Sequence, residues 1–260
     1  MTLRDMLPRR GTAAAPAVSS GDATVTAEFD EIGAHYDRLV GMSPGYDAQL
    51  DESARLLVGL LRRRPGRGDA PLRIADIGCG SGASIAALVR ALTESGMPFE
   101  MDGIDGSAGM LAAVEKKSWP AGVRFRRVQA ENLVADGTTY DAIFAAYLVR
   151  NVPYKDAFLR TARDLLTPGG VLVVHDYGVA GRPLDAASWT ALNWAIIIPS
   201  AWVVTRRPQL FTYLWRSVLD FDSDERLRAR LADAGFAEVG QRPVRGWQRG
   251  MVRATWGRRP

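Results

Sequence analysis

The sequence is poor in the residues from which disulfides and metal sites are built. The chain of 260 residues holds one cysteine, Cys79, and two histidines, His35 and His175. A single cysteine excludes an intramolecular disulfide and a zinc site made of several cysteines. Two histidines argue against a histidine-rich metal site. We therefore expect that the function of this protein does not depend on a bound metal.

Lysine is also scarce, so arginine supplies nearly all of the 33 basic residues. The net charge is +4 and the sequence pI is about 9.4. A protein that binds nucleic acid gathers such charge into one face or stripe. Here it is spread among 29 acidic residues, with short runs at Arg62–Arg64, Arg126–Arg127 and Arg206–Arg207. We interpret the excess as compositional bias and expect no nucleic-acid partner; a basic patch that faces RNA or a membrane is the alternative.

The first two dozen residues lack a hydrophobic run. A signal peptide needs an apolar stretch of roughly 7–15 residues, whereas this segment is rich in Ala, Pro, Ser and Gly. We predict a disordered tail over 1–23. Together with the single cysteine, this predicts a cytoplasmic protein.

The remaining chain has the composition of a globular domain, with 47% hydrophobic and 24% charged residues. We expect one domain over 24–260, since its length fits one large unit. A helical pattern runs from Phe29 to Arg63, which predicts an N-terminal helical lid over 24–66. The apolar positions recur at spacings of four, three and four residues: Leu50, Ala54, Leu57 and Leu61.

Short apolar runs then alternate with amphipathic stretches. The predicted strands are Leu72–Ile77, Glu100–Ile104, Val123–Gln129, Asp141–Leu148, Val171–His175, Val239–Val244 and Gly250–Trp256. The predicted helices are Ser84–Leu92, Ala108–Glu115, Pro153–Leu166, which the turn Thr167-Pro168-Gly169-Gly170 ends, and Ser223–Ala234. Strands that alternate with helices imply crossover units, so the fold class is α/β with a mainly parallel sheet.

A glycine-rich turn follows the first of these strands, in the sequence LRIADIGCGSGAS over 72–84. Gly78, Gly80 and Gly82 permit a tight turn and let a ligand approach the backbone closely. In open α/β sheets, ligands bind beyond the carboxyl ends of the strands. The spacing is not the GxGxxG of dinucleotide folds, and the GK[ST] ending of a phosphate loop is missing. The turn therefore argues against NAD and ATP; a sharp turn without a ligand is the alternative.

An acidic residue, Asp105, ends the next predicted strand, 23 residues after Gly82. A carboxylate at this place can accept hydrogen bonds from both ribose hydroxyls of a nucleoside. The alternative is an aspartate of the loop or of a helix cap before Ser107. Together with the glycines, Asp105 predicts a nucleoside-binding site.

With these features, the chain resembles the class I S-adenosylmethionine-dependent methyltransferases over roughly residues 28–256. The motifs that carry the resemblance are DIGCGSG with GIDGSAGML, VQAENL over 128–133, YDAIFAAYLVRNVP over 140–153 and LTPGGVLVVHDYG over 166–178. The resemblance implies a Rossmann-like fold with a mainly parallel seven-stranded sheet flanked by helices. It also implies the cofactor S-adenosyl-L-methionine, which leaves as S-adenosyl-L-homocysteine.

The same resemblance assigns the cofactor site residue by residue. Gln129 stands where the family usually has Asp or Asn, and its amide oxygen can still meet the adenine amino group. We expect Tyr36 to act as a lid residue, and Cys79 to be a small filler rather than a nucleophile. The cofactor-binding residues are expected to be Tyr36, Asp76, Gly78, Cys79, Gly80, Gly82, Asp105, Gly106, Met110, Gln129, Ala130, Glu131 and Ala146.

Further motifs resemble the ubiquinone/menaquinone C-methyltransferase family: EFDEIGAHYDRL over 28–39, RNV over 150–152, HDYG with a later DAGF over 233–236, and PQLFTYLWRSVLDF over 208–221. This resemblance implies methylation of a small lipophilic aromatic acceptor, with quinone- or phenol-type C-methylation as the leading version. The alternatives are O- or N-methylation of a secondary metabolite, and a protein of this fold that binds cofactor and ligand without methyl transfer. An RNA methyltransferase is disfavoured, because an RNA channel would be basic with interleaved aromatics.

Three residues are candidates for catalysis: His175, Asp176 and Arg150. A histidine can act as a base near neutral pH, although His175 can equally be a packed histidine. Asp176 can orient it or take the proton itself. Neighbours on a strand point to opposite faces, so regular geometry brings only one of the two to the site. Arg150 can stabilise a phenolate, or form a salt bridge that ties its loop.

An aromatic segment over 183–218 holds four of the seven tryptophans. We expect a helical substrate-cap insertion, with three interpretations: an ordinary cap on the sheet, the wall of an apolar pocket, or contact with a membrane surface. Its apolar run is shorter than the roughly 20 residues that cross a bilayer. The expected partners are the acceptor, a membrane surface and a second copy of the chain. The predicted substrate-binding residues are Tyr147, Asn151, Tyr177, Trp194 and Trp202.

Overall fold

Seven strands form one sheet in the order β3-β2-β1-β4-β5-β7-β6 in the computed structural model, which describes residues 45–64, 70–199, 208–246 and 250–260. Strands β1 to β5 run parallel, and β7 is antiparallel to both β5 and β6. This confirms the predicted fold class. The strands are β1 (Leu72–Ile77), β2 (Phe99–Asp105), β3 (Val123–Arg127), β4 (Tyr140–Ala146), β5 (Leu166–Tyr177), β6 (Ala237–Pro243) and β7 (Val252–Arg258).

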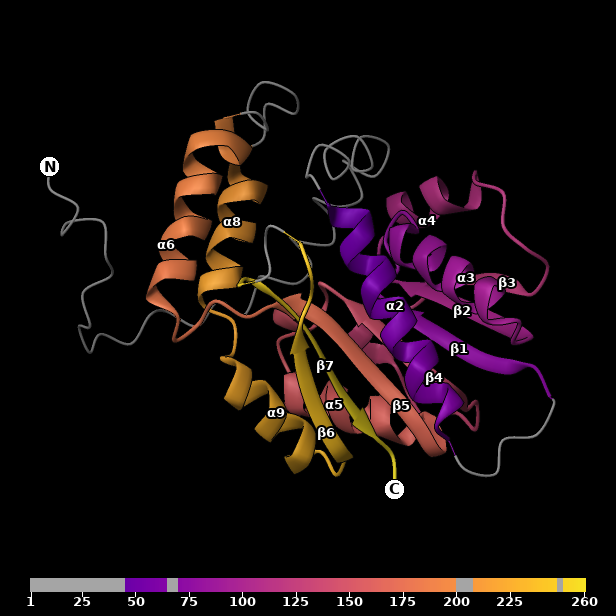
Figure 1. The fold of residues 1–260 in the computed structure, drawn as a ribbon. Coiled ribbons are helices and arrows are strands. Elements are labelled where there is room, and N and C mark those ends of the chain that lie inside the picture. The colour runs from indigo at the N-terminus through magenta and orange to yellow at the C-terminus, as the bar shows by residue number, and fades with distance from the viewer. Residues whose placement is uncertain (1–44, 65–69, 200–207, 247–249) are drawn as a thin grey trace, which may run out of the picture.

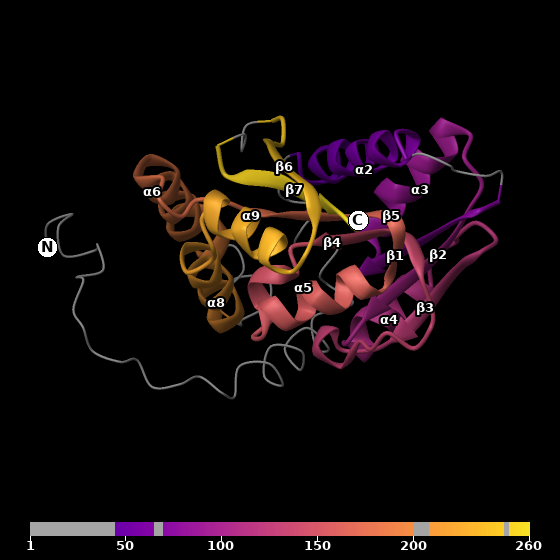
Figure 2. The same cartoon turned by 90° about the horizontal axis from the view of Figure 1, so that it is seen from below.

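Helices cover both faces of the sheet (Figure 1). Figure 2 shows α2 and α3 above the sheet and α5 and α9 below it, while α6 and α8 lie side by side beyond the carboxyl end of β5. The α-helices are α2 (Tyr46–Arg62), α3 (Ala83–Ser95), α4 (Ala108–Glu115), α5 (Lys155–Asp164), α6 (Pro183–Leu192), α8 (Pro208–Leu219) and α9 (Asp224–Asp233). Shorter turns are the 3-10 helices η2 (Ala130–Asn132) and η3 (Val149–Asn151), and the π-helix η4 (Asn193–Ile197).

The apolar stripe of helix α2 determines where this helix packs. Leu50, Ala54, Leu57 and Leu61 are all 0% exposed, as the spacing predicts. They belong to a core that α2 and α3 share with β1, β4 and β5. Helix α2 therefore packs on the face of the sheet, and its first residue, Tyr46, is the part of it that lines the cavity described below. The earlier part of the predicted lid, up to residue 44, lies outside the described residues.

A second core fills the opposite face. Phe158 and Leu159 of α5 and Leu231 of α9 pack there against apolar side chains of β4 and β5. Both faces of the central strands are thus covered, which explains why their sequences read as continuous apolar runs rather than as alternating ones.

Two predicted boundaries are wrong around Thr167–Gly170. Helix α5 ends at Asp164, and β5 already begins at Leu166, so the predicted turn is part of the strand. The register between β4 and β5 shifts after Tyr140, and Gly169 has φ 75°, so the strand absorbs the Pro-Gly-Gly sequence as an irregularity. β4 in turn ends at Ala146, since Tyr147 has φ 54° and leaves the extended conformation.

The segment 183–218 is helical wherever the structure describes it, as expected for a cap; residues 200–207 lie outside the described part. Trp189 of α6 and Val218 of α8 pack on Val252 and Ala254 of β7 in a third, separate core. Trp189 also lies against Tyr177 at the end of β5, with 4.5 Å between the ring centroids. In the portion of the chain that the structure describes, no helix has the length and apolarity needed to cross a membrane.

The strand order places the site. β1 has β2 on one side and β4 on the other, because the chain runs outward through β2 to β3 and then crosses back over β1 to β4. A crevice forms at such a switch point, beyond the carboxyl ends of the two strands. The segments that follow β1 and β4, which begin at Gly78 and Tyr147, therefore face each other across it.

Candidate functional site

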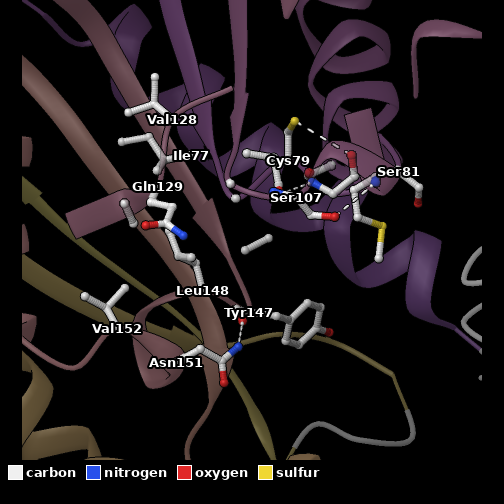
Figure 3. A pocket seen from close by; sticks show the side chains of 18 of the residues that line it. Ile77, Cys79, Ser81, Ser107, Val128, Gln129, Tyr147, Leu148, Asn151 and Val152 are labelled. Atoms are coloured by element: carbon white, nitrogen blue, oxygen red, sulfur yellow. Dashed lines mark hydrogen bonds between the residues drawn. The ribbon is translucent and has the colours of Figure 1, made fainter. Parts of the chain in front are cut away.

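A cavity occupies this switch point (Figure 3). In the view, Cys79 and Ser81 of the glycine turn lie on one side, Gln129 and Val152 on the other, and Tyr147 at the lower end. The predicted site residues that line it are Gly78, Cys79, Gly80, Asp105, Gly106, Met110, Gln129, Ala130, Glu131, Ala146, Tyr147, Arg150 and Asn151. Sequence reasoning missed Tyr46, Ile77, Ser81, Ala83, Ser84, Ser107, Val128, Leu148 and Val152, which also line it.

The glycine turn is held by the neighbouring strand. The backbone N–H groups of Gly78 and Cys79 both donate to the carbonyl oxygen of Ile104, at 2.7 and 3.1 Å. Gly78 and Gly80 have φ 75° and 54°, which glycine adopts without the strain that other residues suffer. A Cβ at Gly80 would meet no atom within 4 Å, because it would project into open space. The turn thus presents bare backbone to a ligand.

Gly82 is required for a different reason. A Cβ there would lie 2.5 Å from Val114, which belongs to α4, and 2.9 Å from Trp119, which follows α4 in the chain. This third glycine lets α3 and the segment around α4 pack closely, and it does not line the cavity. The structure thus shows a packing role for Gly82, and its contact with a cofactor stays a prediction.

Asp105 connects the turn to the next strand. One carboxylate oxygen accepts the N–H of Gly80 at 2.8 Å, and the other accepts the N–H of Ser107 at 2.8 Å. The cap of α4 is Ser107, whose hydroxyl accepts the N–H of Met110. Ser107, and not Asp105, therefore caps α4, whereas the alternative of a loop aspartate is seen in the bond to Ser107. Asp105 also lines the cavity.

A second carboxylate, Asp76, lies behind the turn and is fully buried. Its Oδ2 accepts the hydroxyl of Ser84 at 2.5 Å, while its Oδ1 is buried without a hydrogen-bond partner. Burial raises the pKa of Asp76 to about 7, although the hydrogen bond from Ser84 acts to lower this pKa. Asp76 does not itself line the cavity, but Ser84 does, so the carboxyl lies directly behind the wall.

Cys79 is a buried free thiol within the turn. Burial, and then the nearby carboxyls of Asp76 and Asp105, raise the pKa of the Cys79 thiol far above its usual value. A thiol that stays protonated is a poor nucleophile. The packing of its sulfur near Gly103 agrees with the expected role of a small filler.

Gln129 and η2 form the opposite wall. A Cβ on Gly106 would lie only 3.0 Å from Cγ of Gln129, so the two segments are in close contact. The Oε1 of Gln129 accepts the side-chain amide of Asn132 at 3.3 Å. Ala130 and Glu131 continue this wall. A side-chain amide and the η2 turn thus form the part of the wall that lies near Gly106.

Tyr147 forms the other end of the cavity. Its ring stacks on Tyr46 with 5.5 Å between centroids, and its hydroxyl donates to Gln49 at 3.4 Å. Burial raises the pKa of Tyr147 well above its usual value, so it stays a neutral phenol. The Nδ2 of Asn151 donates to the carbonyl of Tyr147 at 3.1 Å (Figure 3). Aromatic side chains therefore line this end of the cavity.

Arg150 and Asp176 form a buried ion pair at this aromatic end. The Nη1 of Arg150 donates to Oδ1 of Asp176 at 2.6 Å, with side-chain exposures of 7% and 1%. The guanidinium lies 5.5 Å from the ring of Tyr147 and 5.6 Å from that of Tyr177. The salt bridge that ties the η3 loop is therefore present, and Arg150 still lines the cavity. Asp176 and Tyr177 do not themselves line the cavity.

His175 lies on the other face of β5, as alternation predicts, beneath α2. Its ring is fully buried, and its Nδ1 shares a 2.7 Å hydrogen bond with the hydroxyl of Ser53. Burial, followed by the charge of Arg150, lowers the pKa of His175 to about 3. His175 does not line the cavity, so the structure gives it a packed environment instead of direct access to a substrate.

One further predicted residue, Trp194, does not line the described cavity. Trp194 on η4 is 54% exposed and lies against Trp215, with the rings nearly perpendicular. Tyr36 and Trp202 lie outside the described residues.

The cavity fits the group that the resemblance implies. Gly80 offers open space beside bare backbone, Asp105 offers a carboxylate, and Gln129 offers an amide on the far wall. Asp76 adds a buried carboxylate oxygen that lacks a partner, which suits the cationic methionine part of S-adenosylmethionine. These residues match the nucleoside and amino-acid ends of that molecule.

Comparison with known proteins agrees with this reading. A model of the ubiE/COQ5 methyltransferase family matches residues 18–256. The ubiquinone/menaquinone biosynthesis C-methyltransferase UbiE of Pseudomonas paraeruginosa is 27% identical over 245 residues, which cover 89% of this chain and 92% of that protein.

Solved structures share the fold at lower identity. The CurJ carbon methyltransferase superposes with a TM-score of 0.63 at 16% identity, over 92% of this chain and 67% of that one. The plantazolicin methyltransferase BpumL, solved in complex with S-adenosylhomocysteine, gives a TM-score of 0.60 at 11% identity, over 91% and 94%. With its sheet order, its cavity and the match over most of its length, this chain belongs to the ubiE/COQ5 methyltransferase family and is an S-adenosylmethionine-dependent methyltransferase.

Proposed function

We propose that the enzyme methylates a ring carbon of a small lipophilic aromatic acceptor of the quinol or phenol type. The observation that carries the proposal is the character of the cavity's lower end. There, the stacked rings of Tyr46 and Tyr147 adjoin the guanidinium of Arg150. A flat aromatic ring fits beside such a wall, and a guanidinium suits the oxygen that the ring carries. The UbiE relative, a ubiquinone/menaquinone biosynthesis C-methyltransferase, supports the same choice.

The chain's own residues then have separate tasks. When bound, S-adenosylmethionine supplies a methyl group that its positively charged sulfur has activated. Asp105 would hold the ribose, Gln129 the adenine, and Tyr147 with Asn151 the acceptor. Holding the two reactants in line and excluding water can supply much of the rate enhancement.

Arg150 would stabilise negative charge on the acceptor oxygen. A phenol becomes a stronger carbon nucleophile when it loses or shares its hydroxyl proton, and a fixed cation favours that form. Asp176 would keep the guanidinium in place through the 2.6 Å ion pair. The ring carbon would bond to the methyl carbon as the methyl–sulfur bond breaks and S-adenosylhomocysteine leaves. The ring carbon would then release its proton to solvent, so that the ring becomes aromatic again. His175 would act by packing, since it does not line the cavity.

We also propose that the cap contacts a membrane surface, where lipophilic acceptors reside. Leu184, Trp194 and Ile196 on α6 and η4 are 82%, 54% and 57% exposed. No charged residue occurs from 186 to 205, and Arg206–Arg207 follows in the sequence. Apolar and tryptophan side chains beside arginines are typical of an interfacial contact.

Vesicle sedimentation tests this contact. The protein should bind vesicles that contain phosphatidylglycerol, and Trp194→Glu should weaken the binding. If the variant binds as well as the wild type, the cap is not the contact. A dimer that Trp194→Glu dissociates, with no vesicle binding, would assign the exposed face to a second copy instead.

The methylation proposal is tested with radiolabelled S-adenosylmethionine and a panel of acceptors. The panel holds a reduced demethylmenaquinone analogue, simple phenols, a phenol O-methylated in advance and an aliphatic amine. We expect label on the quinol and free phenols only. Label on the amine alone, or on no acceptor at all, would overturn the proposal.

A further inference from the structure

Two buried polar residues interrupt the apolar face of α2. Gln49 and Ser53 are 1% and 0% exposed and lie one helical turn apart, among the leucines that pack on the sheet. A buried polar side chain destabilises the fold unless it finds a hydrogen-bond partner. Both partners lie just beyond or at the carboxyl ends of β4 and β5: Tyr147 for Gln49, and His175 for Ser53.

Ser53 orients the ring of His175. The distance from its Oγ to Nδ1 of His175 is 2.7 Å, which is a well-formed hydrogen bond. The other ring nitrogen, Nε2, is buried and has no hydrogen-bond partner. The hydroxyl of Ser53 is therefore the group that selects one orientation of the imidazole.

His175 in turn supports Tyr147. The two rings meet nearly at right angles, with 4.8 Å between centroids, and the N–H of Tyr147 donates to the carbonyl of His175 at 2.7 Å. Tyr147 has φ 54°, a left-handed conformation that a residue with a side chain adopts only when its surroundings hold it. Such residues cluster at functional sites, and Tyr147 lines the cavity.

We propose that Ser53 is a positioning residue for methyl transfer, which acts through His175 to hold the ring of Tyr147 against the acceptor. This inference rests on the proposed function, since it assigns Tyr147 to the acceptor end of the cavity. Ser53 does not line the cavity. Its contribution should appear in the turnover of the acceptor and not in the affinity for the methyl donor, which Asp105 and the glycine turn would hold.

The test compares two neighbouring positions on α2. Ser53→Ala removes the hydroxyl, whereas Ala54→Gly changes a residue that is equally buried and destabilises the helix while the Ser53 hydroxyl stays in place. We expect Ser53→Ala to lower kcat at least about tenfold, because small displacements of positioning groups have effects of this size. Ser53→Thr, which keeps a hydroxyl, should recover most of it. Ala54→Gly should lose thermal stability but keep kcat.

The affinity for S-adenosylhomocysteine, measured by calorimetry, should remain unchanged in all three variants. In a His175→Phe background, Ser53→Ala should have little further effect, because residues that act as one unit are not additive. The inference is overturned if Ser53→Ala keeps the wild-type kcat, if Ala54→Gly loses as much, or if the two effects simply add.

A second measurement does not need an acceptor. The chain has only two histidines, so the imidazole ¹⁵N resonances of His175 are readily identified. Ser53→Ala should shift the Nδ1 resonance, and a spectrum identical to that of the wild type would overturn the inference. Failure of the proposed function is distinct, because it would appear as the absence of turnover in the wild-type enzyme.

Discussion

The carboxylate of Asp105 accepts the backbone N–H of Gly80 at 2.8 Å, and so joins the end of β2 to the turn that follows β1. Its second oxygen accepts the N–H of Ser107. The backbone of both neighbouring segments therefore fixes the direction of this carboxylate. A ligand hydroxyl that reaches it meets an oriented acceptor.

Asp105→Ala should weaken the binding of S-adenosylhomocysteine at least about 100-fold. Two hydrogen bonds to a charged group contribute about 1.5–3 kcal/mol each, and the turn also loses its anchor. Titration calorimetry measures the change. Asp102→Ala is the matched control: Asp102 lies on the same strand, accepts the hydroxyl of Tyr140 and does not line the cavity. Equal affinities in the two variants would refute the ribose role of Asp105.

Gly80→Ala should also abolish most cofactor binding. The added Cβ enters open space beside the bare backbone, and φ 54° strains a residue with a side chain by about 1–2 kcal/mol. Gly96→Ala separates these effects, since Gly96 has φ 71° and similar open space but ends α3 far from the cavity. Both variants should unfold at lower temperature, and only Gly80→Ala should lose S-adenosylhomocysteine. If Gly80→Ala retains full affinity, no ligand lies against this turn.

Asp176→Ala should destabilise the enzyme by about 3–5 kcal/mol, because it deprives the buried guanidinium of Arg150 of this carboxylate. Urea denaturation measures the free energy of unfolding. Asp51→Ala removes the partner of Arg90 at the same distance of 2.6 Å, but that pair is exposed. Its loss should amount to at most about 1 kcal/mol. If the two variants lose similar amounts of unfolding free energy, burial does not make the ion pair of Asp176 more important for stability.

The cofactor-free enzyme should show a pH dependence that belongs to Asp76. Its pKa is raised to about 7 in the folded state by burial, from about 4 in the unfolded chain. Between these values the unfolded chain ionises while the folded state stays protonated, so this group lowers stability as the pH rises from about 4 to about 7.

His175 has the opposite effect, since its folded pKa of about 3 lies below the unfolded value. It lowers stability as the pH falls from about 6.5 towards 3. His175 is present in both the wild type and Asp76→Asn, so the difference in stability between the two proteins does not contain its contribution. The variant should gain stability relative to the wild type between pH 5 and pH 8, as urea denaturation at the two pH values would show. A constant difference would contradict a raised pKa of Asp76.

Much of the fold was predictable because apolar periodicity reports burial directly. The buried stripe of α2 and the exact span of α4, Ala108–Glu115, follow from pattern and capping alone. The end of β4 could not be predicted, since nothing in the sequence shows that Tyr147 adopts a positive φ. The Pro-Gly-Gly sequence after α5 also looks like a turn, while pairing with β4 draws it into a strand.

The lining of the cavity by Gly78, Gly80 and Asp105 could be predicted, because a motif specifies the backbone conformation or the strand end at which each residue lies. The contact of Tyr46 was missed, because a helix at the start of the described chain reaches the cavity only through the tertiary fold. The packing of Gly82 against Trp119 was not predicted, because it depends on a contact between segments that are far apart in the sequence. The roles of Ser53 and Gln49 depend on contacts across the sheet face, which no local pattern encodes.

The position of the transferred methyl group tests the central claim most directly. The enzyme is incubated with S-adenosylmethionine labelled with ¹³C in its methyl group and with a reduced demethylmenaquinone analogue in detergent micelles. The product is then examined by heteronuclear NMR. The proposal predicts a labelled methyl group bonded to a ring carbon and correlated with the neighbouring ring carbons. A labelled methyl group bonded only to oxygen, or no labelled product while S-adenosylhomocysteine still binds, would contradict it.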